Sequence, residues 1–373
     1  MISIYCINPS CKKRENQDDS RNCSACHTPL LIQEQYRLLK PLRKLEERAN
    51  TEVFEVDARE TPKVLKVLQD PQNPKLLSMF EREARTLQRL QHPGVPRVEL
   101  DGYFTFVTNN GTKLHCLVME KFEGQNLEQW LENNKPISQA LAVDWLTQLT
   151  TILGMLHQNE LFHRDIKLSN IILKPDGQLA LIDFGMVRKM TNTYFAKVSD
   201  SSRREVTSIV SVGYSPPEQM NGKAVPQSDF YALGRCLVHL LTGVHPLNFP
   251  EDEQTGKLIW YDSNKPPVDI WLADLIDDLI APLLRHRPLN TQEILQRLDT
   301  GKFLPQIKAS LRKLNLYWLK GILNFVVLLI VLNIAWFWWR DKQPWLEAEQ
   351  QSLKLQNAYD CIGKSMQNKC DRH

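Results

Sequence analysis

The residues best suited to chemistry lie in two short motifs near the middle of the chain. Residues 163–170 read His-Arg-Asp-Ile-Lys-Leu-Ser-Asn, and an Asp-Phe-Gly tripeptide begins at Asp183, 13 residues after Asn170. Transfer of a phosphoryl group requires metal ions on the phosphate oxygens, an acceptor hydroxyl in line and a carboxylate beside that hydroxyl. Asp165 offers this carboxylate, while Asn170 and Asp183 offer the hard oxygen ligands that suit Mg²⁺. Lys167 is suited to neutralise charge on the transferring group.

The surrounding sequence predicts both strands and helices to hold these residues. Residues 35–300 read as one long mixed segment. Apolar runs at residues 63–68 and 114–120 have the length of strands. Residues 138–158 carry apolar side chains at helical spacing, so we expect a helix with one apolar face. That face is formed by Leu141, Trp145, Leu149, Ile152 and Leu156.

The two motifs and their spacing resemble those of eukaryotic-type (Hanks-type) serine/threonine protein kinases over roughly residues 35–300. The resemblance implies an α+β, bilobal protein kinase fold. Its N-lobe would contain an antiparallel sheet and one helix, and its C-lobe would be mostly helical. It also implies transfer of the γ-phosphate of ATP to Ser or Thr hydroxyls of proteins, including the chain itself, with Mg²⁺ as cofactor. The catalytic residues would be Asp165 and Lys167.

Further residues match the nucleotide-binding pattern of the family in the expected order. Lys66 resembles the third-strand lysine that holds the α- and β-phosphates, and Glu83 resembles its ion-pair partner on the following helix. Residues 117–120 read Leu-Val-Met-Glu and resemble the strand that leads to the hinge. The resemblance therefore puts Met119 at the gatekeeper position. The other expected adenine contacts are Glu120, Phe122 and Val53.

Residues 213–218 read Gly-Tyr-Ser-Pro-Pro-Glu and resemble the end of a kinase activation segment, with Pro-Pro-Glu where Ala-Pro-Glu is usual. The resemblance implies an ion pair between Glu218 and Arg287. It makes Asp229 the buried aspartate that ties a long central helix to the catalytic loop. A lysine two residues after the catalytic aspartate is typical of serine/threonine kinases. Ser211 stands where the family has a hydroxyl residue that contacts this aspartate.

One part of the family pattern is missing. The loop that covers the phosphates usually reads G-x-G-x-x-G-x-V, but residues 42–53 contain no glycine and the first glycine of the chain is Gly94. Glycine lets the backbone approach a phosphate closely and adopt positive φ freely. Two interpretations follow: an enzyme that binds ATP more weakly and turns over more slowly, or a pseudokinase that acts as a nucleotide-binding scaffold at the membrane. We favour the enzyme, because Lys66, Asp165 and Asp183 are all present.

The segment that follows the Asp-Phe-Gly motif is long and rich in Ser and Thr. Arg164 directly precedes Asp165, and an arginine at this position can pair with a phosphorylated loop residue. The sequence therefore predicts regulation by phosphorylation at Thr207 or Ser208. The simpler interpretation is a loop rich in small polar residues.

Four cysteines lie within the first 26 residues, at Cys6, Cys11, Cys23 and Cys26. Two close pairs joined by a short loop suit tetrahedral Zn²⁺ held by four thiolates. The spacing therefore predicts a zinc-ribbon-like module over residues 1–32, which resembles the four-cysteine module of some cyanobacterial kinases. Thiol-based sensing is a second interpretation. Residues 23–27 also match a c-type haem attachment motif, but haem would leave the first two cysteines unexplained.

The C-terminal part of the sequence predicts a membrane anchor. Residues 321–339 contain no charge, and at about 1.5 Å per residue they nearly span a hydrocarbon core of about 30 Å. Tyr and Trp cluster at both ends, so we expect a transmembrane helix at residues 317–339. The twenty preceding residues hold five basic residues and no acid, and the twenty following hold three basic and three acidic residues. This asymmetry favours a cytoplasmic kinase domain.

On this interpretation the chain is a single-pass membrane protein, with a basic linker at residues 301–316 and an extracytoplasmic tail at residues 340–373. A disulfide between Cys361 and Cys370 is plausible if that side is oxidising. Asparagines in the apolar segment could hydrogen-bond across a helix pair, which leaves a homodimer open. The apolar run at the start of the chain stops at Cys6, so no secretory signal is expected.

Composition and charge exclude several other classes. Hydrophobic residues make up 42% of the 373 residues and charged residues 24%, which is ordinary for a globular protein and excludes a wholly disordered or collagen-like chain. Lys and Arg total 46 and Asp and Glu total 43, so charge gives no reason to expect nucleic acid as a partner. The expected partners are protein substrates with Ser or Thr acceptors and the lipid bilayer.

Overall fold

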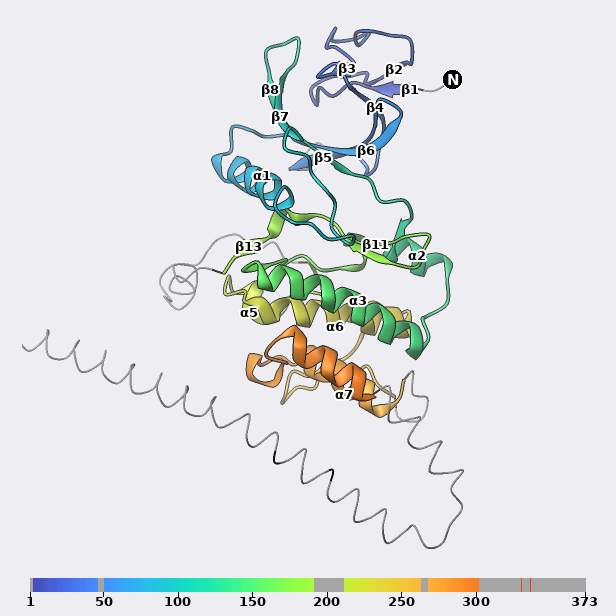
Figure 1. Ribbon diagram of the computed structural model, residues 1–373, viewed down its shortest axis with the longest axis vertical. Helices are drawn as coiled ribbons and strands as arrows, with labels where there is room; N and C mark the ends of the chain where they lie inside the picture. The colour runs from blue at the N-terminus through green and yellow to red at the C-terminus, as the bar shows by residue number, and fades with distance from the viewer. Residues whose placement is uncertain are drawn as a thin grey trace, which may run out of the picture. The chain divides into compact units, whose positions relative to one another are not determined.

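An antiparallel sheet forms the N-terminal half of the described chain. The structure, a computed structural model, describes residues 3–45, 50–190, 211–262 and 268–301 and the single residues 330 and 336. Within these residues the sheet has eight strands, which are labelled in Figure 1. Seven of them lie in the order β2 (Glu15–Gln17), β1 (Ser3–Tyr5), β4 (Tyr36–Pro41), β5 (Thr51–Ala58), β6 (Thr61–Leu68), β8 (Lys113–Glu120) and β7 (Tyr103–Val107). The eighth strand, β3 (Leu31–Ile32), also pairs with β4.

The central strands give this sheet two different faces. Buried Phe54 and Val56 alternate with half-buried residues along β5, as expected for a strand whose side chains point alternately to opposite faces. On one face, these two residues pack in a cluster with Ile7 and Ile32 from the first 32 residues. Lys66 belongs to the opposite face, which is turned toward the helical half of the protein.

The cysteine-containing segment is joined directly to this sheet. Tyr5 on β1 pairs with Leu38 on β4. Arg14 forms a two-pronged ion pair with Glu52 on β5, with N–O distances of 2.6 and 2.8 Å, and the two side chains are only 11% and 4% exposed. The Arg14 Nε atom also donates a hydrogen bond to the Cys6 carbonyl at 2.9 Å. The segment therefore shares one compact unit with the sheet.

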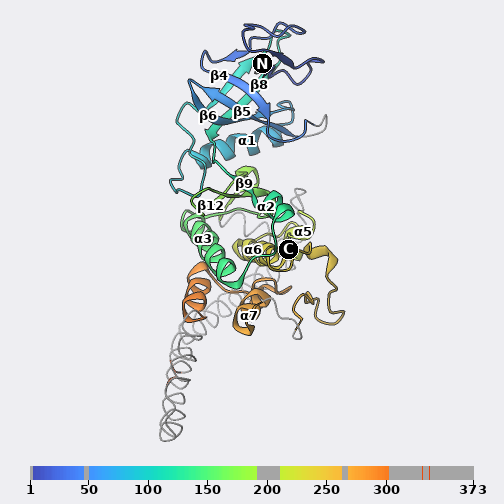
Figure 2. The same cartoon turned by 90° about the vertical axis from the view of Figure 1, so that its right-hand side faces the viewer.

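Helix α1 (Pro74–Leu87) packs against the sheet on the side of the helical half (Figures 1 and 2). The Asn73 side chain caps its first turn by accepting hydrogen bonds from two backbone N–H groups, and proline suits the first helical position because its missing N–H needs no partner there. One face of the helix is apolar and buried, while Glu83 on the same helix is 2% exposed. The buried apolar residues are Phe80, Ala84 and Leu87.

The C-terminal half is mostly helical (Figure 1). Its helices are α2 (Leu127–Asn133), α3 (Gln139–Gln158), α5 (Pro217–Met220), α6 (Pro226–Thr242) and α7 (Ile270–Leu279), and residues 291–301 are also helical. The short strands are β9 (Gln125–Asn126), β10 (Leu161–Phe162), β11 (Ile171–Leu173), β12 (Leu179–Leu181) and β13 (Arg188–Lys189). Helix α6 packs against both α3 and α7 and supplies much of the larger apolar core.

The predicted strands and helix are confirmed. Strand β6 includes residues 63–68, and β8 includes residues 114–120. Helix α3 begins directly after Ser138, whose Oγ atom accepts the Leu141 N–H at 3.3 Å and so caps the helix. Four of the five apolar residues predicted for its face are buried, and Leu141 is half-buried.

The predicted C-terminal features fall almost wholly outside the described residues. The linker at 301–316, the transmembrane helix at 317–339 and the tail at 340–373 are described only at Gly301, Ile330 and Trp336. Among the helices that the structure does describe, none is long and apolar enough to cross a membrane.

We expect the Arg14–Glu52 ion pair to contribute to the stability of the folded chain. Arg14→Ala would leave the Glu52 carboxylate nearly buried without its cation, so we expect the free energy of unfolding to fall by about 3 kcal/mol. Urea denaturation measures this change. Arg21→Ala is the control, because it removes an exposed arginine of the same segment, and it should cost less than about 0.5 kcal/mol. Equal losses in the two variants would contradict a structural role for the pair.

Candidate active site

Asp229, near the start of α6, fixes the backbone of the central motif. Its carboxylate accepts hydrogen bonds from the backbone N–H groups of His163 and Arg164, both at 2.8 Å. Arg164 has a φ of 71°, a left-handed value that a residue other than glycine keeps only where its surroundings hold it. The Gln219 side chain of α5 donates to the Arg164 carbonyl at 2.7 Å. These contacts give the motif one defined backbone path.

His163 supports the backbone of the central motif from inside the protein. Its ring is fully buried and lies edge-on to the Phe184 ring, with 5.0 Å between the centroids. Burial lowers the pKa of His163 and outweighs the nearby carboxylates. The imidazole is therefore neutral at neutral pH, and its Nδ1 atom accepts the Asp165 N–H at 3.3 Å. The ring supports the motif and is enclosed away from solvent.

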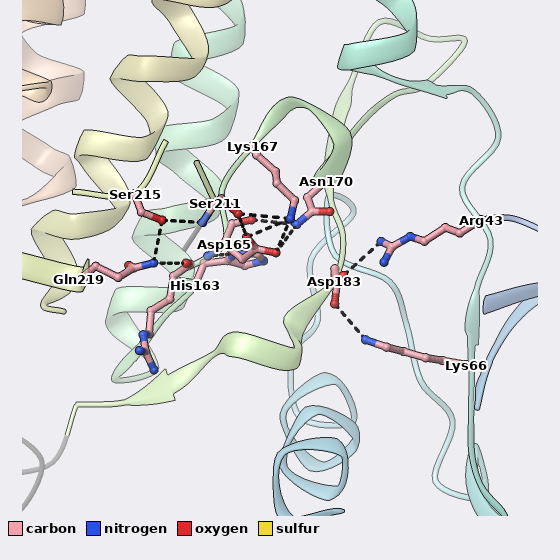
Figure 3. Close-up of polar contacts among 11 residues, drawn as sticks. Arg43, Lys66, His163, Asp165, Lys167, Asn170, Asp183, Ser211, Ser215 and Gln219 are labelled. Atoms are coloured by element: carbon pink, nitrogen blue, oxygen red, sulfur yellow. Dashed lines mark hydrogen bonds and ion pairs between the residues drawn. The ribbon is translucent and has the colours of Figure 1, made fainter. Parts of the chain in front are cut away.

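The Asp165 carboxylate is held by three neighbours (Figure 3). The Asn170 side-chain amide donates to its Oδ2 atom at 2.8 Å, and the Lys167 ammonium lies 3.0 Å from the same oxygen. The Ser211 hydroxyl donates to Oδ1 at 2.5 Å, and Lys167 also contacts the Ser211 oxygen at 3.3 Å. Asp165 is thus oriented to accept a hydrogen bond from a serine hydroxyl, beside a lysine that can balance negative charge.

Asn170 and Asp183 have the chemistry of magnesium ligands. The Asn170 carbonyl accepts the Ile182 N–H at 2.9 Å, which brings the residue after Ile182 close to Asn170. The Asn170 Oδ1 atom is buried and has no hydrogen-bond partner within the described residues, and a buried polar atom without a partner is costly. A hard cation would satisfy it together with the Asp183 carboxylate, which fits the oxygen ligands that Mg²⁺ prefers.

A buried ion cluster lies beside these ligands. The Lys66 ammonium contacts both Glu83 oxygens and the Asp183 Oδ1 atom, each at 2.9 Å. Burial alone would lower the pKa of Lys66, but the Asp183 and Glu83 carboxylates raise it above its ordinary value. Burial would likewise raise the pKa of Asp183, but Lys66 and Arg43 hold it well below its usual range. Lysine and aspartate are therefore both charged at neutral pH.

Gly185 leaves room for this cluster. A Cβ atom built at this position would lie 3.2 Å from a Glu83 oxygen and 3.6 Å from the Lys66 ammonium. The turn that contains it (Phe184–Met186) also packs against α1. Asp183, just before this turn, has a φ of 66°. A left-handed aspartate held next to an ion cluster is typical of strained backbone at functional sites.

The activation-segment end is fastened to the helical core. Arg287 donates to both Glu218 oxygens, at 2.7 and 3.1 Å, and to the Ala281 carbonyl at 2.7 Å. The Ser228 hydroxyl of α6 donates to the same Glu218 carboxylate at 2.7 Å. The ion pair expected from the sequence is therefore present, and it connects α5 to the segment before residue 291. Thr207 and Ser208 lie outside the described residues.

The four N-terminal cysteines converge. The sulfur atoms of Cys6, Cys11, Cys23 and Cys26 all lie within 4.8 Å of one another. The cluster has its own small apolar surround that includes Ile4 and Leu30, and the thiols are not joined by disulfides. Four sulfur atoms at this spacing match the ligand number of a closed tetrahedral zinc site. Cys361 and Cys370, by contrast, lie outside the described residues.

Comparison with known proteins agrees with this geometry. A family model described as the protein kinase domain matches residues 49–296. The chain belongs to the protein kinase family. The matched range includes the ion cluster, the central motif and the Glu218–Arg287 pair of this kinase. The matched range does not include the cysteine cluster.

The curated relatives of this kinase include cyanobacterial serine/threonine-protein kinases. It is 32% identical over 305 residues to serine/threonine-protein kinase B of Synechocystis sp., which covers 79% of the chain and 51% of the relative. Identity to serine/threonine-protein kinase F of Synechocystis sp. is 32% over 331 residues, covering 81% and 64%. Identity to PknA of Nostoc sp. is 35% over 238 residues, covering 61% and 40%. The chain therefore spans about 40–64% of the length of these relatives.

The residues expected around adenine lie on β5, on β8 and directly after β8. Val53 pairs with Lys66 across β5 and β6. Met119 is buried near the end of β8, Glu120 is the last residue of that strand and Phe122 follows it, half-buried. A pocket beside α1 is lined by Lys66, Asp165 and Asp183, and its other polar lining residues are Asn50, Thr51 and Glu83. The four residues expected around adenine are not among its lining residues, so their contact with adenine stays a prediction.

Two contacts of the kinase were missed by sequence reasoning. Arg43, in the glycine-free loop, forms an ion pair with the Asp183 Oδ2 atom at 3.1 Å (Figure 3). Arg14 and Glu52 tie the cysteine segment to the sheet. Arg14, Glu52 and Arg43 lie outside the motifs, and the only available signal for Arg43 was a cation in the loop where glycines were expected.

Proposed function

We propose that this kinase transfers the γ-phosphate of ATP to serine or threonine hydroxyls of proteins, including its own. The observation that carries the proposal is the contact between Asp165 and the Ser211 hydroxyl, with Lys167 touching both. Ser211 shows that a serine hydroxyl can donate to this carboxylate. The hydroxyl of a substrate serine or threonine would occupy a similar position. The names of the cyanobacterial relatives support serine and threonine as acceptors, and so does a lysine two residues after Asp165.

The roles of the side chains follow from their contacts. Asp165 accepts the hydrogen bond of the acceptor hydroxyl and then its proton, while Asn170 and Lys167 keep the carboxylate oriented. Lys66, fixed by Glu83, holds the α- and β-phosphates. Asn170 and Asp183 would hold Mg²⁺, which would neutralise negative charge on the phosphates. Lys167 balances the remaining negative charge near the acceptor.

Asp165→Asn tests the assignment in the full 373-residue chain. The variant keeps the shape of the side chain but cannot accept a proton, so phosphate transfer from labelled ATP should fall by about a hundredfold or more. Asp101→Asn, at an exposed turn, is the control and should transfer normally. Retained transfer by Asp165→Asn would refute the assigned role. If the folded chain without any substitution transfers no phosphate, the pseudokinase scaffold would be favoured.

We also propose regulation by phosphorylation of the activation segment. Arg164 directly precedes the catalytic aspartate, which suits it to pair with a phosphorylated residue of that segment. Phosphopeptide mapping of the active chain in the transfer assay is expected to find Thr207 or Ser208 modified. An unmodified segment in active kinase would count against this regulation.

The cysteine cluster supports a zinc proposal. We expect the purified chain to contain one Zn²⁺, held by Cys6, Cys11, Cys23 and Cys26, and elemental analysis measures it. Cys23→Ser should lose the metal and lower the melting temperature, because a structural zinc contributes to folding. Cys116→Ala is the control, since it removes a buried thiol outside the cluster and should retain the metal. Metal-free protein with full stability would instead favour thiol-based sensing.

A membrane anchor at residues 317–339 is the proposal for localisation, with the kinase domain in the cytoplasm and the C-terminal tail across the membrane. It rests on the uncharged apolar run and its basic N-terminal flank. An arginine at the centre of such a helix costs about 2.5–3.5 kcal/mol, so Leu329→Arg should shift the chain from the membrane fraction to the soluble fraction. Leu329→Ala is the control and should remain with membranes. If the chain without any substitution is found in the soluble fraction, the proposed membrane anchor would be refuted.

A further inference from the structure

Among the described residues of the loop between β4 and β5, Arg43 extends its side chain to the active site. The Leu42 N–H donates to the Val53 carbonyl at 2.8 Å, which fixes the start of the loop against β5. Leu45 packs on the apolar cluster between the sheet and the cysteine segment. Arg43 lies between these two anchors, so its backbone is held close to the sheet while its side chain extends away from it.

The Arg43 side chain ends at the Asp183 carboxylate. Figure 3 shows Arg43 and Lys66 pointing toward Asp183, and each contacts a different carboxylate oxygen. The Arg43 side chain is 51% exposed, whereas that of Lys66 is 8% exposed. Arg43 is thus the more solvent-accessible of two cations on the same metal ligand, and it comes from the loop that covers the phosphates in this family.

A phosphate-covering loop without glycine needs another source of hydrogen-bond donors. Glycine allows backbone N–H groups to approach a phosphate closely, and residues 42–53 have no glycine. A guanidinium carries five N–H donors in a planar fork at the end of a long side chain, and it binds phosphate oxygens in pairs. An arginine can therefore supply these donors from its side chain.

We propose that Arg43 binds the β- and γ-phosphate oxygens of ATP and replaces the backbone amides of a glycine-rich loop. The inference rests on the proposed function, because it takes ATP with Mg²⁺ as the ligand. The Arg43 guanidinium lies 3.1 Å from Asp183, which would hold Mg²⁺ together with Asn170. Phosphates brought to the same place by the metal would therefore lie within reach of this guanidinium, and its positive charge would attract them.

Nucleotide affinity of the full chain tests this role. Arg43→Gln removes the charge and keeps a polar side chain, and calorimetric titration measures its binding of ATP with Mg²⁺ and of adenosine. Loss of a charge-assisted, two-pronged contact should weaken ATP binding by about tenfold or more. Adenosine, which has no phosphate, should bind within about twofold of its affinity for the unchanged chain.

Two further variants isolate the geometry of the contact. Lys44→Gln removes the same charge from the adjacent exposed position, and its ATP affinity should stay within about twofold. Arg43→Lys keeps the charge without the fork, so its ATP affinity should lie between those of the unchanged chain and Arg43→Gln. Melting curves without nucleotide should change little in all three variants, because both side chains are largely exposed and Lys66 still pairs with Asp183 when Arg43 is replaced.

Several outcomes would overturn the proposal. If Arg43→Gln and Lys44→Gln lose equal ATP affinity, the effect of Arg43 is general electrostatic attraction. If Arg43→Gln loses equal affinity for ATP and adenosine, the substitution has distorted the site. If Arg43→Gln binds ATP more tightly, the Arg43–Asp183 ion pair hinders ATP binding instead of supporting it. Because binding is the readout, the two proposals fail separately: a chain that binds ATP through Arg43 but transfers no phosphate contradicts only the proposed function. A chain that binds no nucleotide contradicts both.

Discussion

The buried ion cluster of Lys66, Glu83 and Asp183 is the constraint on which the rest of the structure depends. Each charge comes from a different element: strand β6, helix α1 and the turn that follows β12. Charges are costly to bury unless they are paired, so the cluster exists only while sheet, helix and turn keep their relative positions. The glycine in that turn leaves the space that the cluster needs. The packing of the two halves and the geometry of the site are therefore maintained by the same contacts.

The sequence predicted the parts of the site that depend on short-range spacing. Residues 163–170 were recognisable because their chemistry requires fixed residue types within a few positions, and the helix at 138–158 because apolar residues recur at a fixed period. Arg43 was missed because its partner lies 140 residues away, and no local pattern marks a side chain that crosses to another element. Arg14 was missed for a similar reason: arginine is usually exposed, and nothing near it in the sequence indicates a buried partner.

The position of the cysteine segment also required the structure. Cysteine spacing predicts a local metal-binding unit but not the surface on which that unit packs. A segment of this size buries little apolar surface by itself, and it is supported by packing Ile7 and Ile32 on the sheet. Arg14 connects the Cys6 carbonyl to Glu52, the residue before Val53 on β5. The cysteine cluster and the start of the nucleotide-facing strand are therefore linked through one side chain.

Strands β1 and β3 also decide what the sheet offers to other molecules. Strand β4 has β5 on one side and both of these short strands on the other. An uncovered strand edge presents unpaired N–H and C=O groups on which a strand from another chain can add, and such edges promote aggregation. The first 32 residues cover this edge. Their main-chain pairing with β4 therefore occupies groups that a strand of another copy could otherwise use, which opposes edge-to-edge association.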